Sequence, residues 1–454
     1  MNQNIAVVPI VADLSFRERC SHALGISVPI ILALSSQNLL NVVDTWIVGQ
    51  LGSLELACVA LGSTINWVFC AFFIGMGGGV QAMVARRVGE DRADETIGVL
   101  NRSLFLILVA VIPLTLFVSI FSEWGLAATT SRDDILLVGD PYLCARLAGI
   151  PFVAANFSFR GYWNGLSLSR IYLRTLVFIH VINIGLTYVL VFGFAGIPAM
   201  GVFGAGISTT IAQALGTIYY CLQAGHVGPV KGFLKRGYQV SIRSLLRLGT
   251  PVGIQSLLFS LGFLIFFTIT ERLGTQQLGA TQVLVTMALI SILPGVGFGL
   301  GGASLVGQSL GAGRVEDARY WGWLCMAMAA ISVGLIGLGE ALTAPFWMNT
   351  FIATDPMAAQ IGITPLRIIG SIMVFDVIGV VLMNTLIGAG ATTTVMWWSA
   401  LTQYGIMLPA AWYAALHTSY GLIGLWSAFA IYRVIFALSM VVIWKGNSWT
   451  KAQV

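Results

Sequence analysis

The chain has 454 residues, of which 57% are hydrophobic and 9% are charged, and its mean hydropathy is +0.89. Soluble domains carry about 25% charged residues, so this composition excludes an ordinary soluble protein and indicates a polytopic membrane protein. The formal net charge of +5 does not indicate a nucleic-acid partner, because the basic residues lie in short loops and form no single block. The six cysteines show no CxxC pair and no zinc-ligand spacing, so we expect no metal and no cofactor.

Twelve apolar segments are long enough to cross a bilayer, since a helix needs about 20 apolar residues to span the hydrocarbon. In chain order they cover residues 23–48, 56–82, 98–121, 141–165, 171–193, 199–223, 246–271, 279–306, 319–341, 361–388, 394–416 and 422–444. The runs are continuously apolar and do not alternate every second residue, which argues against a β-barrel. The sequence therefore predicts an all-α polytopic membrane protein.

The distribution of Lys and Arg predicts the orientation, because cytoplasmic loops hold the positive excess. With the N-terminus inside, the inner loops carry most of the basic residues, and the outer loops carry Arg132 and Arg272. We therefore expect both termini in the cytoplasm of a multi-pass protein of the cell membrane, which is the inner membrane in a bacterium. The lipid bilayer surrounds it, and we expect a monomer.

The two halves of the chain repeat. Pro29 recurs as Pro251, and the same offset in residue number relates Arg92 to Arg314. We call the distance along the chain from Pro29 to Pro251 the repeat offset. The longest inner loop lies between the halves, so we expect a six-helix lobe over 1–222, a cytoplasmic linker over 223–243 and a second six-helix lobe over 244–454. Each half holds an even number of helices, so the repeats are parallel, as in transporters whose substrate site lies between repeats.

Asp44 is the first functional candidate, because it lies inside an otherwise apolar segment. An ionised side chain at bilayer depth costs about 2.5–3.5 kcal/mol on insertion scales, and such residues usually mark an ion or substrate route. Gln37 and Asn41 precede Asp44 by about two turns and one turn on a similar helix face, so they are candidates for a substrate cavity. Pro29 lets the same helix bend and is the candidate hinge.

Other polar residues at membrane depth are further candidates. Gln255 is a cavity candidate, because an amide in a spanning helix needs a polar partner or water. Arg433 lies near the middle of the last segment, too deep to reach the headgroups easily. We therefore expect it to pair with Asp376, an acid at comparable depth in the same half. Arg146 lies near the outer face, where its side chain can reach the headgroups. The role of Arg160 stays open.

The chain resembles the multidrug and toxic compound extrusion (MATE) transporters of the multidrug, oligosaccharide-lipid and polysaccharide exporter superfamily. The resemblance covers nearly the whole chain and rests on the order and spacing of six motifs. These are P-x7-Q-x6-D at Pro29, Gln37 and Asp44; VARRVGEDR with its counterpart GQSLGAGR; Asn183-Ile184 followed by GFAGIPAMGVFGAGIST; Phe375-Asp376; LIGAG ending at Gly390; and GLIGLW ending at Trp426. It implies a V-shaped pair of six-helix lobes that exports organic compounds in exchange for protons or sodium.

The resemblance also implies roles for single residues. Asp44 matches the ion-coupling acid of the first helix, with Asn183 as its polar partner, and Asp376 matches the cation-binding acid of the tenth helix. Thr187 stands where many members have a second acid, and Phe259 stands where a Glu is expected. Sodium needs several oxygen ligands, whereas a proton needs one carboxylate that titrates in a usable range. The missing acids therefore favour the proton.

These observations favour a proton-coupled antiporter that exports amphipathic or cationic organic compounds, such as drugs or metabolites, by alternating access. The cavity candidates are Gln37, Asn41, Thr187, Gln255 and Arg433. A sodium-coupled exporter of one dedicated metabolite stays open. A lipid-linked oligosaccharide flippase also stays open, because its pyrophosphate would need cationic residues such as Arg146 or Arg160. A membrane enzyme is not expected, because the four histidines are scattered and form no cluster with acids.

Overall fold

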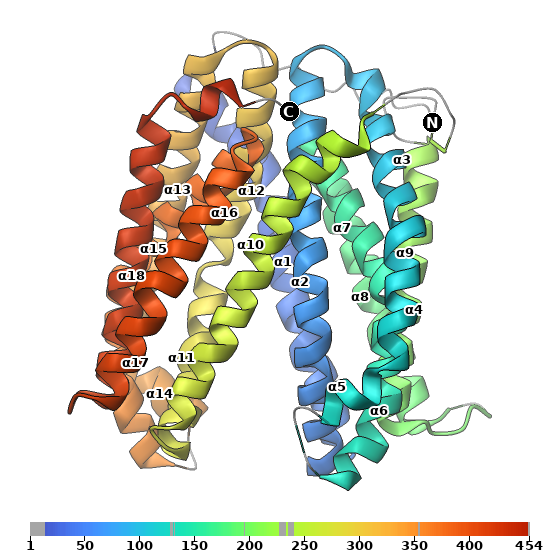
Figure 1. Ribbon diagram of the computed structural model, residues 1–454, viewed down its shortest axis with the longest axis vertical. Helices are drawn as coiled ribbons and strands as arrows, with labels where there is room; N and C mark the ends of the chain where they lie inside the picture. The colour runs from blue at the N-terminus through green and yellow to red at the C-terminus, as the bar shows by residue number, and fades with distance from the viewer. Residues whose placement is uncertain are drawn as a thin grey trace. The chain divides into compact units, whose positions relative to one another are not determined.

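The computed structural model describes residues 14–127, 130, 132–194, 196–226, 233–234, 240–352 and 355–452. These residues are almost entirely helical, and Figure 1 shows long helices joined by short connections. Within the described ranges the only β pairing is an isolated bridge between Phe194 and Ile197. The all-α fold class is confirmed.

In the described part of the first half there are nine α-helices and two short elements of other types. They are α1 (Phe16–Gly49), α2 (Ser53–Gly89), the 3₁₀ turn η1 (Ala93–Glu95), α3 (Thr96–Leu106), the π-helical η2 (Ile107–Val111), α4 (Ile112–Ile120), α5 (Ser122–Ala127), α6 (Asp133–Ala148), α7 (Ile150–Gly165), α8 (Ser169–Phe192) and α9 (Gly201–His226). The stretch from α3 to α4 passes through η2 without a break, so it forms one long helical segment, Ala93–Ile120.

The second half has a corresponding order of elements. They are α10 (Ile242–Glu271), α11 (Thr275–Ser291), α12 (Leu293–Gly311), α13 (Val315–Leu342), α14 (Ala344–Phe351), α15 (Pro356–Gly388), α16 (Thr392–Ala400), the π-helical η3 (Leu401–Met407), α17 (Leu408–Leu416), α18 (Gly421–Lys445) and the 3₁₀ turn η4 (Trp449–Lys451). The short helices α5 and α14 begin one repeat offset apart, at Ser122 and Ala344, so the repeat extends to the minor elements.

The helices account for the predicted spanning segments. Among the described residues, nine helices are long and apolar enough to cross a membrane, and two bent pairs pass the same test together. The remaining predicted segment, 394–416, is helical from Thr392 to Leu416 through η3. The predicted segments 141–165 and 279–306 each correspond to a bent pair of helices. The pairs α6–α7 and α11–α12 bend by 40° and 41°, because Pro151 and Pro294 in the first turns of α7 and α12 lack a backbone N–H.

The chain folds as two compact units. Unit 1 is built from Leu32–Gly253, and unit 2 is built from Ile254 onward together with the part of α1 that ends at Ile31. α1 and α10 therefore each change unit two residues after a proline, Pro29 and Pro251 respectively. The lobe boundaries expected from the sequence stay a prediction, and the units differ from them in the assignment of these two helix starts. Most of the predicted linker, 223–243, lies outside the described residues.

Backbone conformation carries the same repeat. Asp91 and Gly313, one repeat offset apart, follow the ends of α2 and α12 with φ of 58° and 72°. The residue after each of them donates its N–H to a carbonyl five residues back, from Arg92 to Arg87 and from Arg314 to Ser309, at 2.9 and 2.8 Å. Gly52 and Gly274, before α2 and α11, also share a positive φ, of 147° and 125°. The two units therefore use the same turns in the same order.

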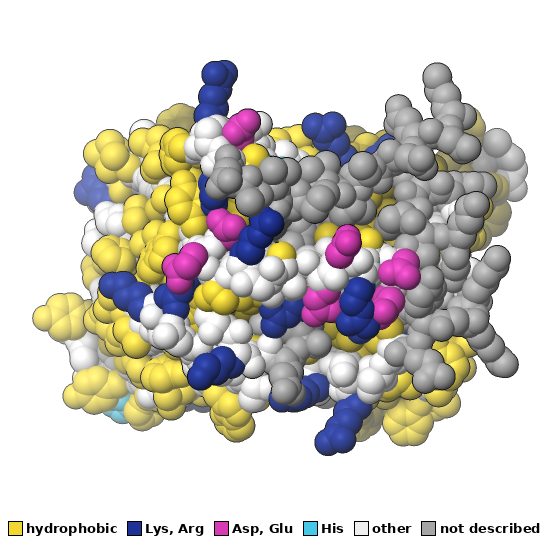
Figure 2. Space-filling view, turned by 90° about the horizontal axis from the view of Figure 1, so that it is seen from above, with side chains coloured by type: hydrophobic (Ala, Val, Ile, Leu, Met, Phe, Trp, Pro, Cys, Tyr) yellow, Lys and Arg dark blue, Asp and Glu magenta, His cyan; other side chains and the backbone are white. Residues whose placement is uncertain are grey.

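Basic side chains mark one end of the molecule. In Figure 2, seen from the end at which α2 connects to α3, more Lys and Arg than Asp and Glu side chains are visible. In that connection Arg92 forms ion pairs with Glu90 and Glu95 at 3.0 and 2.6 Å. This end is the one that the sequence predicts to face the cytoplasm.

Glycines let the helix starts pack closely in each unit. In unit 1, a Cβ on Gly75 of α2 would overlap the backbone carbonyl of Val252 of α10. In unit 2, a Cβ on Gly297 of α12 would overlap the side chain of Ile31 of α1. Gly75 and Gly297 are one repeat offset apart. Each unit therefore packs the start of a helix that continues in the other unit, α10 in unit 1 and α1 in unit 2, against a glycine at the same position of the repeat.

The contact of Gly75 with α10 predicts a stability effect. Gly75→Ala should destabilise the protein by about 1–3 kcal/mol, the usual cost of overpacking, because the new Cβ meets backbone and not a flexible side chain. Gly185→Ala in α8 is the matched control, since nothing lies within 4 Å of a Cβ added there. Thermal unfolding followed by tryptophan fluorescence measures both variants. Equal midpoints for the two would contradict the close contact.

Candidate functional site

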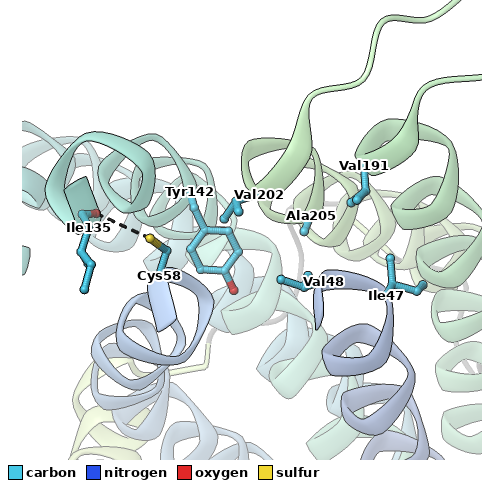
Figure 3. Packing of buried hydrophobic residues seen from close by; sticks show 8 residues of the cluster. All are labelled: Ile47, Val48, Cys58, Ile135, Tyr142, Val191, Val202 and Ala205. Atoms are coloured by element: carbon cyan, nitrogen blue, oxygen red, sulfur yellow. Dashed lines mark hydrogen bonds between the residues drawn. The ribbon is translucent and has the colours of Figure 1, made fainter. Parts of the chain in front are cut away.

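The turn of α1 that follows Asp44 is anchored in unit 1. Ile47 and Val48 are buried in an apolar cluster with residues of α2, α6, α8 and α9 (Figure 3). The other labelled members of the cluster are Cys58, Ile135, Tyr142, Val191, Val202 and Ala205. Cys58 also contacts the carbonyl of Ile135 through its sulfur at 3.7 Å. This packing fixes the position of the preceding turn, and therefore of Asp44, against α8 and α9.

Asp44 lies against a buried amide. With its nitrogen facing the carboxylate, Asn183 of α8 donates to both oxygens of Asp44 at 3.0 and 3.2 Å. The oxygen of the same amide accepts a hydrogen bond from Thr209 of α9 at 3.1 Å. Asn183 is only 1% exposed, so these bonds form out of contact with bulk water. Hydrogen bonds to a carboxylate are stronger than neutral ones, and α1, α8 and α9 are joined at this point.

A second row of polar side chains extends from Asp44 along the same helices. Gln37 donates to the side-chain oxygen of Asn41 at 3.2 Å, and its own oxygen lies 3.2 Å from Nε2 of His180 in α8. Thr187, one turn beyond Asn183, is buried and hydrogen-bonds to Ser208 of α9 at 2.8 Å. Asn41 is exposed, whereas Gln37 is half-buried. The structure therefore brings Asn183 to the acid and joins Gln37 to His180 of the same helix, α8.

The sequence analysis missed the part played by His180. This histidine precedes Asn183 by about one turn and Thr187 by about two, a spacing that places all three on one face of α8. That spacing was a usable signal. It went unused because His180 was compared only with the other histidines, which lie far from it in the sequence.

Arg146 belongs to the electrostatic surroundings of Asp44. It lies in the last turn of α6, just before the bend into α7, and among the described residues it is the charged group that acts on the carboxylate. Its Nε atom is buried and has no hydrogen-bond partner in the described part of the chain. The sequence analysis assigned Arg146 only to the membrane surface, so its influence on Asp44 is new.

In unit 2, Asp376 of α15 and Arg433 of α18 form the ion pair expected from their depth. Both side chains are buried. Aromatic rings surround the guanidinium, with Phe429, Tyr432 and Phe436 centred 5.9, 5.6 and 5.6 Å from its central carbon. The carboxylate is therefore already neutralised, and Arg433 lies inside the helix packing and not on an open surface.

The unit-2 helix that corresponds to α1 carries aromatic groups in place of the acid. Phe266, one repeat offset after Asp44, is buried and packs against Trp426 and Phe429 at ring distances of 5.3 and 5.9 Å. Phe259, where a Glu was expected, is partly exposed, and its backbone carbonyl accepts from Gln403 at 3.1 Å. Gln255 is buried and lies 3.5 Å from the sulfur of Met383. No hydrogen bond among the described residues joins Gln255 to the ion pair.

The polar groups thus fall into two separate sites, one in each unit. The residues in unit 1 are Asp44, Asn183, Gln37, Asn41 and Thr187, and those in unit 2 are Asp376, Arg433 and Gln255. Pro29 lies inside α1, just before the change of unit. Within the described residues no three His, Cys, Asp or Glu side chains are grouped so that they could hold a metal ion.

The comparison with known families decides the membership. The MatE family model matches residues 29–189 and 251–413, one match in each half of the repeat. The chain belongs to the MatE family. Each match begins at one of the two repeated prolines, Pro29 or Pro251, so the family model follows the internal repeat.

Relatives of this MatE protein match over nearly their full length. A Bradyrhizobium diazoefficiens protein named "Probable multidrug resistance protein NorM" is 25% identical over 429 residues, covering 91% of this chain and 90% of the relative. The "Uncharacterized transporter YisQ" of Bacillus subtilis is 22% identical over 431 residues, covering 93% of each. Among solved structures, "Crystal structure of MATE in the straight conformation" matches with a TM-score of 0.86 at 20% identity, covering 94% and 95% of the two chains. This likeness confirms the fold.

The ion pair of unit 2 predicts a strong dependence of stability on both partners. Arg433→Ala should lower stability by about 3–5 kcal/mol, because it leaves the Asp376 carboxylate buried and unpaired. The double variant Arg433→Met with Asp376→Leu should recover most of the loss, since apolar replacement of a whole buried pair is often neutral.

Thermal unfolding of the detergent-solubilised protein measures this prediction. The control is Arg367→Ala, an exposed arginine on α15, which should unfold as the unchanged protein does. If Arg433→Ala is no less stable than Arg367→Ala, the pair contributes nothing to the fold.

Proposed function

We propose that this MatE protein is a proton-coupled antiporter that exports amphipathic or cationic organic compounds by alternating access. The observation that carries the proposal is Asp44, an acid within a spanning helix, held by the buried amide of Asn183. The names of its relatives, multidrug resistance proteins, support an organic substrate. We place the protein, as a monomer of two six-helix lobes, in the cell membrane with both termini in the cytoplasm.

The groups around Asp44 favour a proton over sodium. Sodium needs several oxygen ligands, and the polar groups at Asp44 are one carboxylate and the amide of Asn183. Thr187, where many members have a second acid, contributes no charge, and Arg146 adds a positive charge to the surroundings. In the described part of unit 1, no second carboxylate acts on Asp44. A single carboxylate is a sufficient site for a proton and a poor one for a metal cation.

The proposed cycle uses competition for one carboxylate. Protonation from the outer side neutralises Asp44 and weakens its attraction for a cationic substrate, so the substrate leaves. Release of the proton to the inner side restores the charge, and Asn183 then stabilises the carboxylate until substrate binds again. A potential of 100 mV supplies about 2.3 kcal/mol for each charge moved. This energy is enough to build a modest concentration gradient of the substrate across the membrane.

The prolines of α1 and α10 are the proposed hinges. Each helix changes unit just beyond its proline, and a proline inside a helix removes one backbone hydrogen bond. Bending at Pro29 and Pro251 therefore moves a helix start relative to the rest of the same helix at a small cost. Pro29 lies about four turns before Asp44 on one helix, so movement at the hinge changes the surroundings of the acid.

The two alternatives are supported less well. Sodium coupling would require several oxygen ligands, and the Asp44 carboxylate has one amide, that of Asn183, beside it. A flippase would need free cationic groups for a pyrophosphate, and Arg433 is paired with Asp376. Arg146 and Arg160 are the arginines that keep this alternative open.

Asp44→Asn should abolish drug-driven proton movement, because the amide neither binds nor releases a proton. The measurement is ethidium transport by the purified protein in liposomes, first with a proton gradient and then with a sodium gradient. The unchanged protein should respond to the proton gradient alone, and Asp44→Asn should fall to the level of protein-free vesicles.

Asp134→Asn is the control for this experiment, since Asp134 is exposed and forms an ion pair with Arg132 at 2.5 Å. It should transport as the unchanged protein does. Antiport that survives in Asp44→Asn would overturn the coupling role of this acid, and transport driven by sodium alone would favour the sodium alternative.

A further inference from the structure

Unit 2 contains a second buried carboxylate that the proposed cycle does not use. Glu340, in the last turn of α13, which ends at Leu342, is 5% exposed. Ser291, the last residue of α11, donates a hydrogen bond to its Oε1 atom. The Oε2 atom is buried and, among the described residues, has no hydrogen-bond partner. One oxygen of the carboxyl group is therefore satisfied, and the other is not.

The helix end beside Glu340 is unfavourable for a negative charge. α11 ends at Ser291 and α12 begins at Leu293, with a bend of 41° between them. The C-terminal end of a helix carries a partial negative charge and exposes carbonyl groups without helical partners. Pro294 in the first turn of α12 lacks an N–H and cannot satisfy one of these carbonyls. Glu340 itself lies in the last turn of α13, so an ionised carboxylate would lie at the negative end of its own helix.

No positive charge compensates Glu340 within the described residues. The helices α11, α12 and α14 that pack against α13 contain no charged residue. The charged residues of α15 are Arg367, which is exposed, and Asp376, which is paired with Arg433. On α13 itself, the other charged or titratable groups all lie in its first half, about four turns or more away; they are Glu316, Asp317, Arg319, Tyr320 and Cys325.

We propose that Glu340 is a proton-binding site of unit 2, with the proton on Oε2 and with Oε1 accepting from Ser291. A neutral carboxylic acid removes the buried charge and its repulsion from the negative end of α13. The site has no copy in unit 1, because the residues one repeat offset earlier are Val118 and Phe69. The metal alternative is weaker, since only one side-chain oxygen, that of Ser291, joins the carboxylate.

Infrared difference spectroscopy of the lipid-reconstituted full-length protein tests the site directly. Protonated carboxyl groups have a C=O stretching band that carboxylates lack. The unchanged protein should show such a band at neutral pH, and Glu340→Gln should weaken it. In the Asp44→Asn background, where the other proton-exchanging acid is absent, Glu340→Gln should abolish it. Ser291→Ala should keep the band but move it to higher frequency, because the C=O group loses its hydrogen bond. A purely structural glutamate, ionised and hydrogen-bonded, would show neither effect.

Asp140→Asn is the matched control. Asp140 of α6 accepts a hydrogen bond from Ser122 at 2.6 Å, so it forms the same kind of serine–carboxyl pair, but it is half-buried. Its replacement should leave the protonated-carboxyl band unchanged. Size-exclusion profiles and unfolding midpoints show that the variants are folded. An identical band in the unchanged protein and in Glu340→Gln would overturn the site.

The use of this proton in transport rests on the function proposed above, and a second measurement separates the two. The number of protons moved per ethidium in liposomes should fall in Glu340→Gln, while some proton-driven transport remains. A weakened band with an unchanged ratio would overturn the transport role and leave the proton site standing. A titrating band in a protein that transports nothing would overturn the proposed function alone.

Discussion

The cost of burying an ionised side chain governs the placement of polar groups in this protein. A carboxylate removed from water is tolerated when it is hydrogen-bonded, paired with a cation or protonated. Asp44 receives two hydrogen bonds from one amide, and Asp376 is paired with Arg433. Glu340 has a single serine partner, which is why we assign it a proton. The partners of each carboxyl group determine whether it can take up and release a proton.

The internal repeat reproduces the backbone far more closely than the chemistry. Turns with a positive φ recur at the repeat offset, as at Asp91 and Gly313. Glycines also recur where the start of α10 packs in unit 1 and the start of α1 packs in unit 2. The polar side chains do not recur. Phe266 occupies the position that corresponds to Asp44 and is held among aromatic rings. Backbone turns and close helix contacts constrain the fold in both units, whereas the acid of α1 is needed in one unit alone.

Hydropathy predicted the spanning segments, because the cost of exposing polar groups to lipid extends over the whole length of a helix. It did not predict the breaks at Gly149 and Ile292, since the chain stays apolar across both bends. The signal present in the sequence is the proline shortly after each break, Pro151 and Pro294. The pair of Asp376 and Arg433 could be predicted, because a deep arginine needs a partner. Glu340 could not, since an acid near the end of an apolar run is typical of a residue at the membrane surface.

The partner of Asp44 came from a resemblance and not from a physical signal in the sequence. Asn183 lies far along the chain on another helix, and many amides in spanning segments satisfy the same general rule. Its face of α8 carries His180, Asn183 and Thr187, a pattern of period near 3.6 that marks a polar stripe. Such a stripe predicts that α8 packs against polar groups, but it does not identify those groups. Only the fold determines that the facing side chain is the acid of α1.

The ion pair of unit 2 determines how the work of coupling divides between the two acids. To bind a proton or another cation, Asp376 must first release Arg433, and that leaves a guanidinium among the rings of Phe429, Tyr432 and Phe436. Breaking such a pair typically costs about 3–5 kcal/mol, more than the roughly 2.3 kcal/mol that 100 mV supplies per charge. Asp44 exchanges hydrogen bonds with a neutral amide instead, at a smaller cost. We therefore infer that, of these two acids, Asp44 serves the coupling and Asp376 serves the packing of unit 2.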